Sequence, residues 1–187
     1  MPPQWRGEPE PGLWHFSEQR DISEFVPRPS PRLGGRLLVW AVDTRHSPLF
    51  WFPRDCPRIT FWTAPTTTQA DRERFFGSPI AEGRIHGVED GWWERVRTTR
   101  LFAYRLPPAS FFPEGNAVGY WVCAETVHPL EGLVMDDLIH KHAEAGIGLR
   151  AMGSLWPLWH EVIRSSLGFS GCRLTNARTV QPPDLLP

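Results

Sequence analysis

The sequence predicts an α+β fold: a single domain with a mixed, bent or split β-sheet that short helices flank. Strand-like apolar runs occur both early and late in the chain, and helical patterns of about 7–12 residues lie between them. The length of 187 residues suits one domain, since domains usually hold about 100–200 residues. Hydrophobic residues make up 41% and charged residues 22%, and this balance excludes a disordered or fibrous chain.

We expect residues 12–178 to form this domain. Residues 1–11 hold four prolines and residues 181–187 hold three more, and chain ends of this composition are usually poorly ordered. Residues 1–11 and 179–187 are therefore predicted to be flexible tails.

The first elements follow from apolar runs and from the residues that end them. Residues 13–16 predict a first strand, and residues 21–25 predict a short helix, which Pro27 ends. The proline-rich stretch after this helix is typical of an extended connector. Residues 37–42 form a continuous apolar run between two glycines and an aspartate, which predicts a strand buried on both faces.

The middle of the chain alternates between helical and extended patterns. An Asp-Thr pair can cap a short helix over residues 46–52. β-Branched and aromatic side chains predict a strand over residues 59–62, and a threonine cluster offers the N-cap for a helix over residues 71–76. Apolar side chains at i, i+4 and i+8 predict a helix over residues 88–96. A strand is expected over residues 101–106, before two prolines.

The last third of the chain continues this alternation. Strands are predicted over residues 119–124, 133–135 and 147–152, where β-forming residues gather. Two aspartates start a helix over residues 136–146. Ser154 caps a final helix, which has a proline in its first turn.

Charge and composition exclude several classes of function. Lys and Arg together number 20 against 21 Asp and Glu, a formal net charge of -1, so the chain has no bulk field for binding nucleic acid. No apolar window approaches the roughly 18 residues of a membrane span, and the first residues show no secretory signal. Three well-separated cysteines favour reduced thiols. We therefore expect a cytoplasmic protein.

Common catalytic motifs are absent from the sequence. It holds no phosphate loop, no GxGxxG after a strand, no HExxH and no GxSxG. Asp136 and His140 fall on one helix face, but capping explains acids at a helix start, so no metal site is expected. Cys56 follows Asp55, whose carboxylate would raise the pKa of the thiol. We therefore favour a structural cysteine over a nucleophile paired with His46.

His15 is the first candidate for a catalytic or ligand-facing residue. It lies within an apolar strand, where alternation places Leu13, His15 and Ser17 on one face. A polar ring at such a position is either hydrogen-bonded inside the core or faces a cavity. In the second case, His15 and Ser17 would present two hydrogen-bonding groups to one ligand.

Arg54 and Arg58 are candidate ligand-binding residues. They lie among tryptophans and phenylalanines within residues 39–62, a setting that suits the capture of an anionic or planar ligand. The alternative is that Asp43 or Asp55 pairs with these arginines and fixes a proline-rich turn.

Two further positions bear on function. Glu125 directly follows a predicted strand and is a candidate acid, because sites often assemble where strands end; the alternative is a solvated side chain. Trp92 and Trp93 are adjacent on one predicted helix, so only one of them should be buried. A large apolar patch around the other would indicate a dimer or partner surface.

Four segments of the sequence resemble an uncharacterised bacterial family, a domain of unknown function. The segments are WHFSE with a following IxxFxP (residues 14–27), VWAVD with HSPLFWFPRDCPR (residues 39–58), RTTRLFAYRLPP (residues 97–108) and SGCRLTNA (residues 170–177). The resemblance spans most of residues 12–178. No activity comes with this family.

The order of the parts is also distantly similar to ADP-ribosyltransferase-like folds. These parts are a first strand with His-x-Ser, a strand of the VWAVD type that leads into a helix, and a later strand that ends in an acid. The resemblance implies that His15 and Ser17 hold the ribose and nicotinamide of NAD and that Glu125 is the catalytic acid. The implied function is a domain that binds NAD or a related nucleotide and transfers or removes ADP-ribose, without a metal.

The alternative function is a noncatalytic module that binds a small anion or a protein partner through its Trp- and Arg-rich surface. A homodimer is a possible assembly under this hypothesis. The two hypotheses differ in what they require of His15 and Glu125, because only the enzyme needs these two side chains close together.

Overall fold

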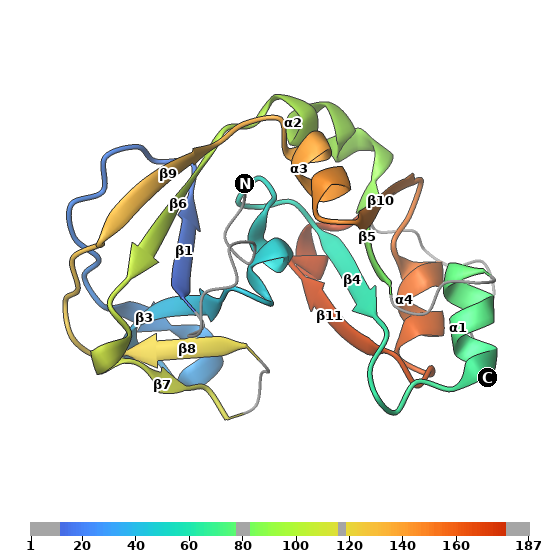
Figure 1. Cartoon of the computed structure of the whole chain (residues 1–187), viewed down its shortest axis with the longest axis horizontal. Helices are drawn as coiled ribbons and strands as arrows, with labels where there is room; N and C mark the ends of the chain where they lie inside the picture. The colour runs from blue at the N-terminus through green and yellow to red at the C-terminus, as the bar shows by residue number, and fades with distance from the viewer. Residues whose placement is uncertain (1–11, 78–82, 116–118, 179–187) are drawn as a thin grey trace. The chain divides into compact units, whose positions relative to one another are not determined.

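The computed structural model describes residues 12–77, 83–115 and 119–178, and the fold within them is α+β with two sheets (Figure 1). This confirms the predicted fold class. The tails predicted at 1–11 and 179–187 lie outside the described residues. The chain divides into two compact units: unit 1 takes in the chain up to Phe52 and Thr99–Asp136, and unit 2 takes in Pro53–Thr98 and the chain from Asp137. The single domain over 12–178 stays a prediction, since compactness alone does not show what folds independently.

Unit 1 is built on an antiparallel sheet. Its strands are β1 (Leu13–Ser17), β2 (Arg28–Ser30), β3 (Arg36–Asp43), β6 (Leu101–Leu106), β7 (Phe112–Pro113), β8 (Tyr120–Cys123) and β9 (Glu131–Met135). They lie in the order β7-β8-β3-β1-β6-β9, and β2 pairs with β3 beside this path. β1 pairs with β3 on one side and with β6 on the other. The strand that carries His15 is therefore an inner strand.

The core of unit 1 gathers apolar side chains from the inner strands and two loops. Its buried members are Leu13, Phe25, Val39, Ala41, Tyr104, Leu106, Phe111, Cys123 and Val127. Burial of one large apolar side chain contributes about 1.5–3 kcal/mol to stability, so this cluster fixes the register of β1, β3 and β6. Three short 3-10 helices, η2 (Pro31–Leu33), η3 (Ser47–Phe50) and η5 (Pro108–Ser110), each have a proline at their start, where its missing N–H costs nothing.

Unit 2 combines a mixed sheet with the four α-helices of the described residues. The strands β4 (Arg58–Trp62), β5 (Arg84–Glu89), β10 (Ile147–Met152) and β11 (Gly168–Cys172) lie in the order β10-β5-β4-β11. β10 runs parallel to β5, whereas the other pairs are antiparallel. The helices are α1 (Gln69–Phe76), α2 (Trp93–Thr98), α3 (Leu138–Glu144) and α4 (Trp156–Val162), with 3-10 turns η4 (Asp90–Trp92) and η6 (Leu174–Asn176).

The core of unit 2 lies on one face of its sheet. Ile59, Phe61 and Ile85 point to this face and pack with Phe75 and Phe76 of α1, and Phe61 makes edge and tilted contacts with both rings. The remaining buried members are Leu155, Val162, Leu167 and Ala177. Since one face of the sheet is apolar, the opposite face is available to other side chains.

Most of the predicted elements are confirmed. The helix predicted over residues 71–76 is α1, and the Thr68 side chain accepts a hydrogen bond from the N–H of Asp71 at 3.2 Å. The helix predicted over residues 136–146 is α3, where Asp137 is the N-cap. The strand predicted over residues 37–42 is buried on both faces from Leu38 to Val42, apart from a half-buried Trp40.

Three helix predictions are wrong in whole or part. Residues 21–25 form no helix, because Phe25 instead exchanges two backbone hydrogen bonds with Val127 at 2.8 and 3.1 Å. In residues 88–96, Val88 belongs to β5, where it pairs with Arg58, and the helix starts only at Trp93. Residues 46–52 form only the 3-10 turn η3. In the first two cases a distant backbone partner prevails over the local pattern.

The described helices are also too short or too polar for a membrane. Within residues 12–77, 83–115 and 119–178, none has the length and apolar character needed to cross one.

Candidate functional site

His15 lies in the middle of β1 with its ring fixed inside unit 1. Its Nδ1 is 2.9 Å from the carbonyl oxygen of Trp40, and because a carbonyl can only accept, this nitrogen carries the proton. The ring centre lies 4.7 Å from that of Phe25, a member of the core. These contacts match the hydrogen-bonded reading of His15, and its role toward a ligand stays a prediction.

Ser17 and Glu125 lie in the same unit as His15. The Ser17 hydroxyl accepts the N–H of Gln19 at 3.0 Å, which forms a local turn. Glu125 has an exposed side chain and follows β8, and its N–H donates to the sulfur of Cys123 at 3.3 Å. Their predicted roles on NAD stay predictions.

Arg54 and Arg58 belong to unit 2, so they lie in a different unit from the three residues above. Arg54 is exposed in the turn before β4. Arg58 is the first residue of β4 and only 5% exposed. Its Nη1 donates to the carbonyl oxygen of Cys56 at 3.0 Å, which orients the guanidinium through the backbone.

Arg58 lies on the face of the unit 2 sheet that is opposite the apolar core, and we call this face the polar face. Directly opposed residues of antiparallel strands point to the same side, so the register of β5, β4 and β11 places three rows there. The rows are Val88, Arg58 and Cys172; His86, Thr60 and Ser170; and Arg84, Trp62 and Gly168. Thr60 and His86 are almost wholly buried, whereas Ser170 and Cys172 are half-buried.

A buried pair of imidazoles is part of this face. His142 of α3 has Nδ1 2.6 Å from the carbonyl oxygen of Leu138, and its Nε2 is 3.1 Å from Nδ1 of His86. Because Leu138 can only accept, Nδ1 of His142 carries its proton. The Nε2 of a neutral His142 then accepts from Nδ1–H of His86. The backbone of α3 thus sets the tautomer of both rings.

Both rings are neutral near pH 7. Burial lowers the pKa of His142 from 6.5 to about 4, against the opposing effect of its hydrogen bond to Leu138. Burial also holds the pKa of His86 well below its ordinary value, and the neighbouring His142, Arg84 and Arg58 lower it further. The positive charge of the polar face therefore comes from the two arginines.

An aromatic ring lies beside these charges. Trp62 packs directly over Gly168, where an added Cβ would lie 2.4 Å from the indole Nε1. The guanidinium carbon of Arg84 lies 5.4 Å from the centre of the same ring. The absence of a side chain at Gly168 thus lets the indole lie against the strand.

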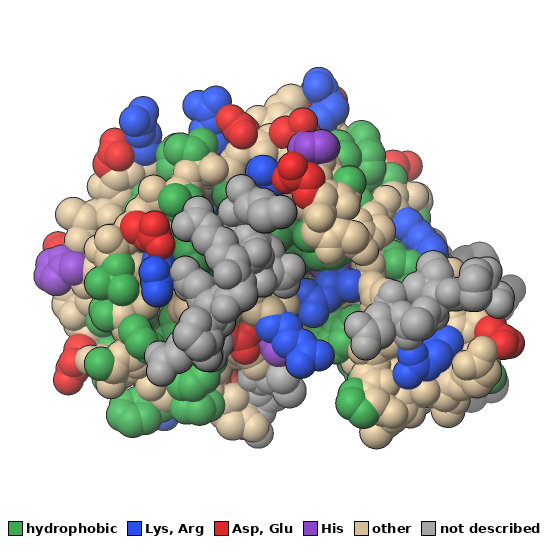
Figure 2. All heavy atoms as spheres, viewed as in Figure 1, with side chains coloured by type: hydrophobic (Ala, Val, Ile, Leu, Met, Phe, Trp, Pro, Cys, Tyr) green, Lys and Arg blue, Asp and Glu red, His purple; other side chains and the backbone are tan. Residues whose placement is uncertain are grey.

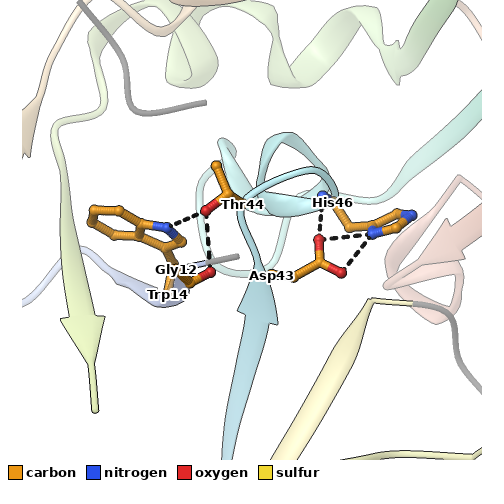
Figure 3. Close-up of polar contacts among 5 residues, drawn as sticks. All are labelled: Gly12, Trp14, Asp43, Thr44 and His46. Carbon is orange, nitrogen blue, oxygen red and sulfur yellow. Dashed lines mark hydrogen bonds and ion pairs between the residues drawn. The ribbon is translucent and has the colours of Figure 1, made fainter. Parts of the chain in front are cut away.

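A second group of polar side chains lies in unit 1, at the end of β3 (Figure 3). The Nδ1 of His46 lies 2.8 and 3.0 Å from the two carboxylate oxygens of Asp43. Next to them, the Thr44 hydroxyl accepts from the indole of Trp14 at 3.0 Å and donates to the carbonyl oxygen of Gly12 at 3.1 Å. These two bonds hold the turn between Asp43 and His46 against β1.

The expectations for Cys56 and for the two adjacent tryptophans can be compared with the structure. Cys56 is fully buried, and burial raises the pKa of its thiol to about 12; this favours the structural reading over a nucleophile. Within the described parts of the chain, no three His, Cys, Asp or Glu side chains are placed to hold a metal ion. Trp92 and Trp93 are both half-buried, so the expected division into one buried and one exposed ring is wrong.

His86 and His142 were not predicted from the sequence as functional residues. They are 56 residues apart, and no local motif marks either one. The one signal in the sequence was that Arg58, Thr60 and Trp62 alternate with apolar residues along β4, which indicates that one face of this strand is polar. Asp43 and His46 could have been found from their i, i+3 spacing directly after a strand.

The comparisons with known proteins give one match. A family model described as a family of unknown function (DUF6886) matches residues 14–177. No curated protein and no solved structure gives a significant match. The resemblance to an uncharacterised family is thereby confirmed, and the distant similarity to ADP-ribosyltransferase-like folds stays a prediction.

Proposed function

Because the chain belongs to DUF6886, a family of unknown function, we propose its function from its own residues: it binds a small anionic ligand of the nucleotide class on the polar face of unit 2. The observation that carries this proposal is the buried guanidinium of Arg58 among hydroxyl and imidazole groups of neighbouring strands. On the visible surface, acidic and basic side chains are interspersed (Figure 2). An anion therefore needs a local site such as this one.

Arg58 has the chemistry to recognise an oxyanion. A guanidinium presents five N–H donors in a planar fork, which matches the geometry of phosphate and carboxylate. The hydrogen bond from Nη1 to Cys56 fixes the orientation of this fork, so little conformational entropy is lost when a ligand binds. The hydroxyls of Thr60 and Ser170 lie in the adjacent row and can donate to the same group.

The third row of the polar face suits a planar ring. Trp62 and Arg84 offer an aromatic surface and a second positive charge, and planar rings stack on such groups. NAD and ADP-ribose combine planar rings with a diphosphate, so they are the first ligands to test.

No acidic side chain of β5 opposes an anion on this face. Glu89 alternates to the other side of the strand, where its two carboxylate oxygens accept the N–H of Arg178 at 3.0 Å. The charge of β4 and β5 on the polar face is therefore that of Arg58 and Arg84.

A thermal melt with a panel of NAD, ADP-ribose, nicotinamide and inorganic phosphate tests this proposal. A ligand at 100 times its Kd adds about 2.7 kcal/mol to the free energy of unfolding, which shifts the Tm of a chain this long by about 5–10 °C. We expect stabilisation by NAD or ADP-ribose that disappears in Arg58→Gln and weakens in Ser170→Ala. The matched control is Arg164→Gln, an exposed arginine outside this sheet.

The Ser170→Ala variant keeps the test informative if Arg58→Gln does not fold, because Ser170 is half-buried and its loss leaves the sheet intact. A panel without any stabilising ligand would reject the proposal. Stabilisation that persists unchanged in both variants would place the ligand elsewhere.

Transfer or removal of ADP-ribose is the second candidate function. The His15 ring contacts the ring of Phe25, and Phe25 forms backbone hydrogen bonds with Val127. These contacts link the segment that follows Glu125 to the strand that carries His15, and this favours the second function. We expect the wild type to release nicotinamide from NAD and Glu125→Gln to lose this activity, with the exposed Glu24→Gln as control. Binding of NAD without release of nicotinamide would leave the binding module as the function.

A further inference from the structure

The strand β11 lies at one end of the unit 2 sheet. It pairs with β4 along one edge, and within the described residues no strand pairs with its other edge (Figure 1). Proteins usually protect such edges with charged residues, proline or very short strands, because the unpaired backbone groups can bind another strand. The other terminal strands follow this rule: β7 is two residues long and ends in Pro113, β9 begins with Glu131, and β10 holds the exposed Arg150.

The edge of β11 has none of these protections. The strand reads Gly-Phe-Ser-Gly-Cys, five residues without a charge or a proline. Each of the five is half-buried or exposed, and Phe169 is 40% exposed. An uncharged edge that is accessible along its whole length can pair with a second strand.

Apolar side chains gather beside this edge, on the face of the sheet that carries the core. Among the described residues of unit 2, the exposed large hydrophobic ones are Ile163 and Phe169. Both adjoin Trp159 of α4: the Phe169 ring centre lies 5.8 Å from that of Trp159, and the N–H of Ile163 donates to the carbonyl oxygen of Trp159 at 3.0 Å. The Trp159 indole covers Gly171, where an added Cβ would lie 2.8 Å from the ring. An exposed apolar border of this kind marks an interaction surface.

The residue pattern of β11 is complementary to itself. In an antiparallel pair of two copies with Ser170 opposite Ser170, Phe169 of each copy lies opposite Gly171 of the other. Opposed residues point to the same side, so each phenylalanine would cover a glycine and meet the indole of Trp159 in the other copy. Aromatic rings opposite edge glycines stabilise such pairs. An axis at Gly171 would instead set Phe169 against Arg173, so the axis at Ser170 fits best.

The charges at the two ends of β11 are also complementary. Arg173 is exposed directly after the strand, and with the axis at Ser170 it comes opposite Leu167 of the second copy, next to Ser166. The N–H and hydroxyl of Ser166 donate to the Asp71 carboxylate at 2.7 and 2.5 Å. These bonds lower the pKa of Asp71, so this carboxylate stays ionised. The pairing therefore brings a guanidinium close to a carboxylate at each end.

We propose that the chain forms a homodimer in which the β11 strands of two copies pair antiparallel about a two-fold axis at Ser170. The unit 2 sheets of the two copies join into one continuous sheet, and Ile163 and Phe169 of both copies become buried at the junction. Phe169 and Ser170 point to opposite faces of the strand, so the interface leaves the polar-face side chains of each copy in place. The homodimer does not depend on the ligand of the polar face.

Sedimentation equilibrium of the full chain over a dilution series tests the homodimer. We expect the wild type to have the mass of two chains, and Phe169→Asp to raise the Kd of the dimer at least about tenfold, because a central aromatic residue often dominates an interface. The matched control is Phe112→Asp, since Phe112 is an exposed phenylalanine of unit 1, and it should keep the wild-type Kd. A monomeric wild type would overturn the inference, as would a wild-type Kd in Phe169→Asp.

A disulfide cross-link tests the register and covers the case in which Phe169→Asp does not fold. Opposed residues of antiparallel strands have Cα atoms about 4.5–5.5 Å apart, which suits a disulfide. We expect Ser170→Cys, combined with Cys172→Ser, to form a covalent dimer on mild oxidation. The control is Ser23→Cys with Cys172→Ser, since Ser23 is exposed in unit 1. Equal cross-linking of the two variants, or none in Ser170→Cys, would overturn the inference. The ligand melts of Arg58→Gln are independent of either result.

Discussion

The three cysteines show how neighbouring residues set the reactivity of a single side chain. Cys56 is fully buried, and burial raises the pKa of its thiol to about 12. The charges of Arg58 and Arg95 act to lower this pKa, and that of Glu89 acts to raise it. Only a thiolate is a strong nucleophile. Cys56 should therefore be inert in the folded protein.

We predict that at pH 8 a disulfide reagent modifies Cys172 first, because Cys172 is the half-buried thiol and Cys56 and Cys123 are buried. Peptide mapping after a short exposure measures the order of reaction. Unfolding in guanidinium should make all three thiols react at similar rates. If Cys56 reacted as fast as Cys172 in the folded protein, the burial argument would fail.

The hydrogen-bond partners of the histidines lie close in the sequence in some cases and far apart in it in others. His46 binds a carboxylate three residues away, so its partner is local. His15 and His142 instead bind backbone carbonyls, of Trp40 and Leu138 respectively. The bond of His15 depends on the pairing of β1 with β3, which residue types alone do not specify.

The start of α1 is fixed by side-chain hydrogen bonds. The Thr68 side chain caps the N–H of Asp71, and the Asp71 carboxylate accepts both the N–H and the hydroxyl of Ser166. These two bonds lower the pKa of Asp71. The Asp71 carboxylate therefore links the first turn of α1 to the segment before β11.

We predict that Thr68→Ala lowers the free energy of unfolding by about 1 kcal/mol, the usual cost of losing an N-cap. Urea unfolding followed by circular dichroism measures the change. Thr66→Ala is the matched control, because Thr66 is exposed and precedes the helix. Equal losses in the two variants would contradict the assigned cap.

Caps and apolar runs were sufficient to predict α1, α3, β3 and β4. β5 and β11 were both missed as strands. β11 reads Gly-Phe-Ser-Gly-Cys and has weak strand propensity of its own. Pairing with β4 over five residues makes it a strand. Three of the nine residues on the polar face, Gly168, Ser170 and Cys172, depend on that pairing.

At the scale of the whole molecule, the buried histidine pair links stability to pH. Both rings have a pKa below 6.5 in the folded protein, so the unfolded chain binds protons that the folded chain does not. Stability from this source is fully present above pH 6.5 and is lost as the pH falls toward 4. Each histidine contributes a slope of up to about 1.4 kcal/mol per pH unit in this range.

We predict that the free energy of unfolding falls as the pH is lowered from 6.5 to 5.5, a window in which most carboxyl groups stay ionised. Denaturant unfolding at several pH values measures the slope. His142→Leu should have a shallower slope than the wild type, whereas His140→Gln should keep it, since His140 is exposed. An unchanged slope in His142→Leu would show that this histidine is protonated equally in both states.

The amino-acid sequence alone was enough for the α+β class, most of the strands and the family. These features rest on local periodicity, caps and turns, which a short window of residues contains. It also named Arg58 as a ligand-binding candidate. Residue types could not show that His86 meets His142, that Gly119 supports His46, or that Trp62 lies over Gly168. Each of these contacts joins residues at least 56 positions apart, and they exist only because strand pairing and helix packing bring distant segments together.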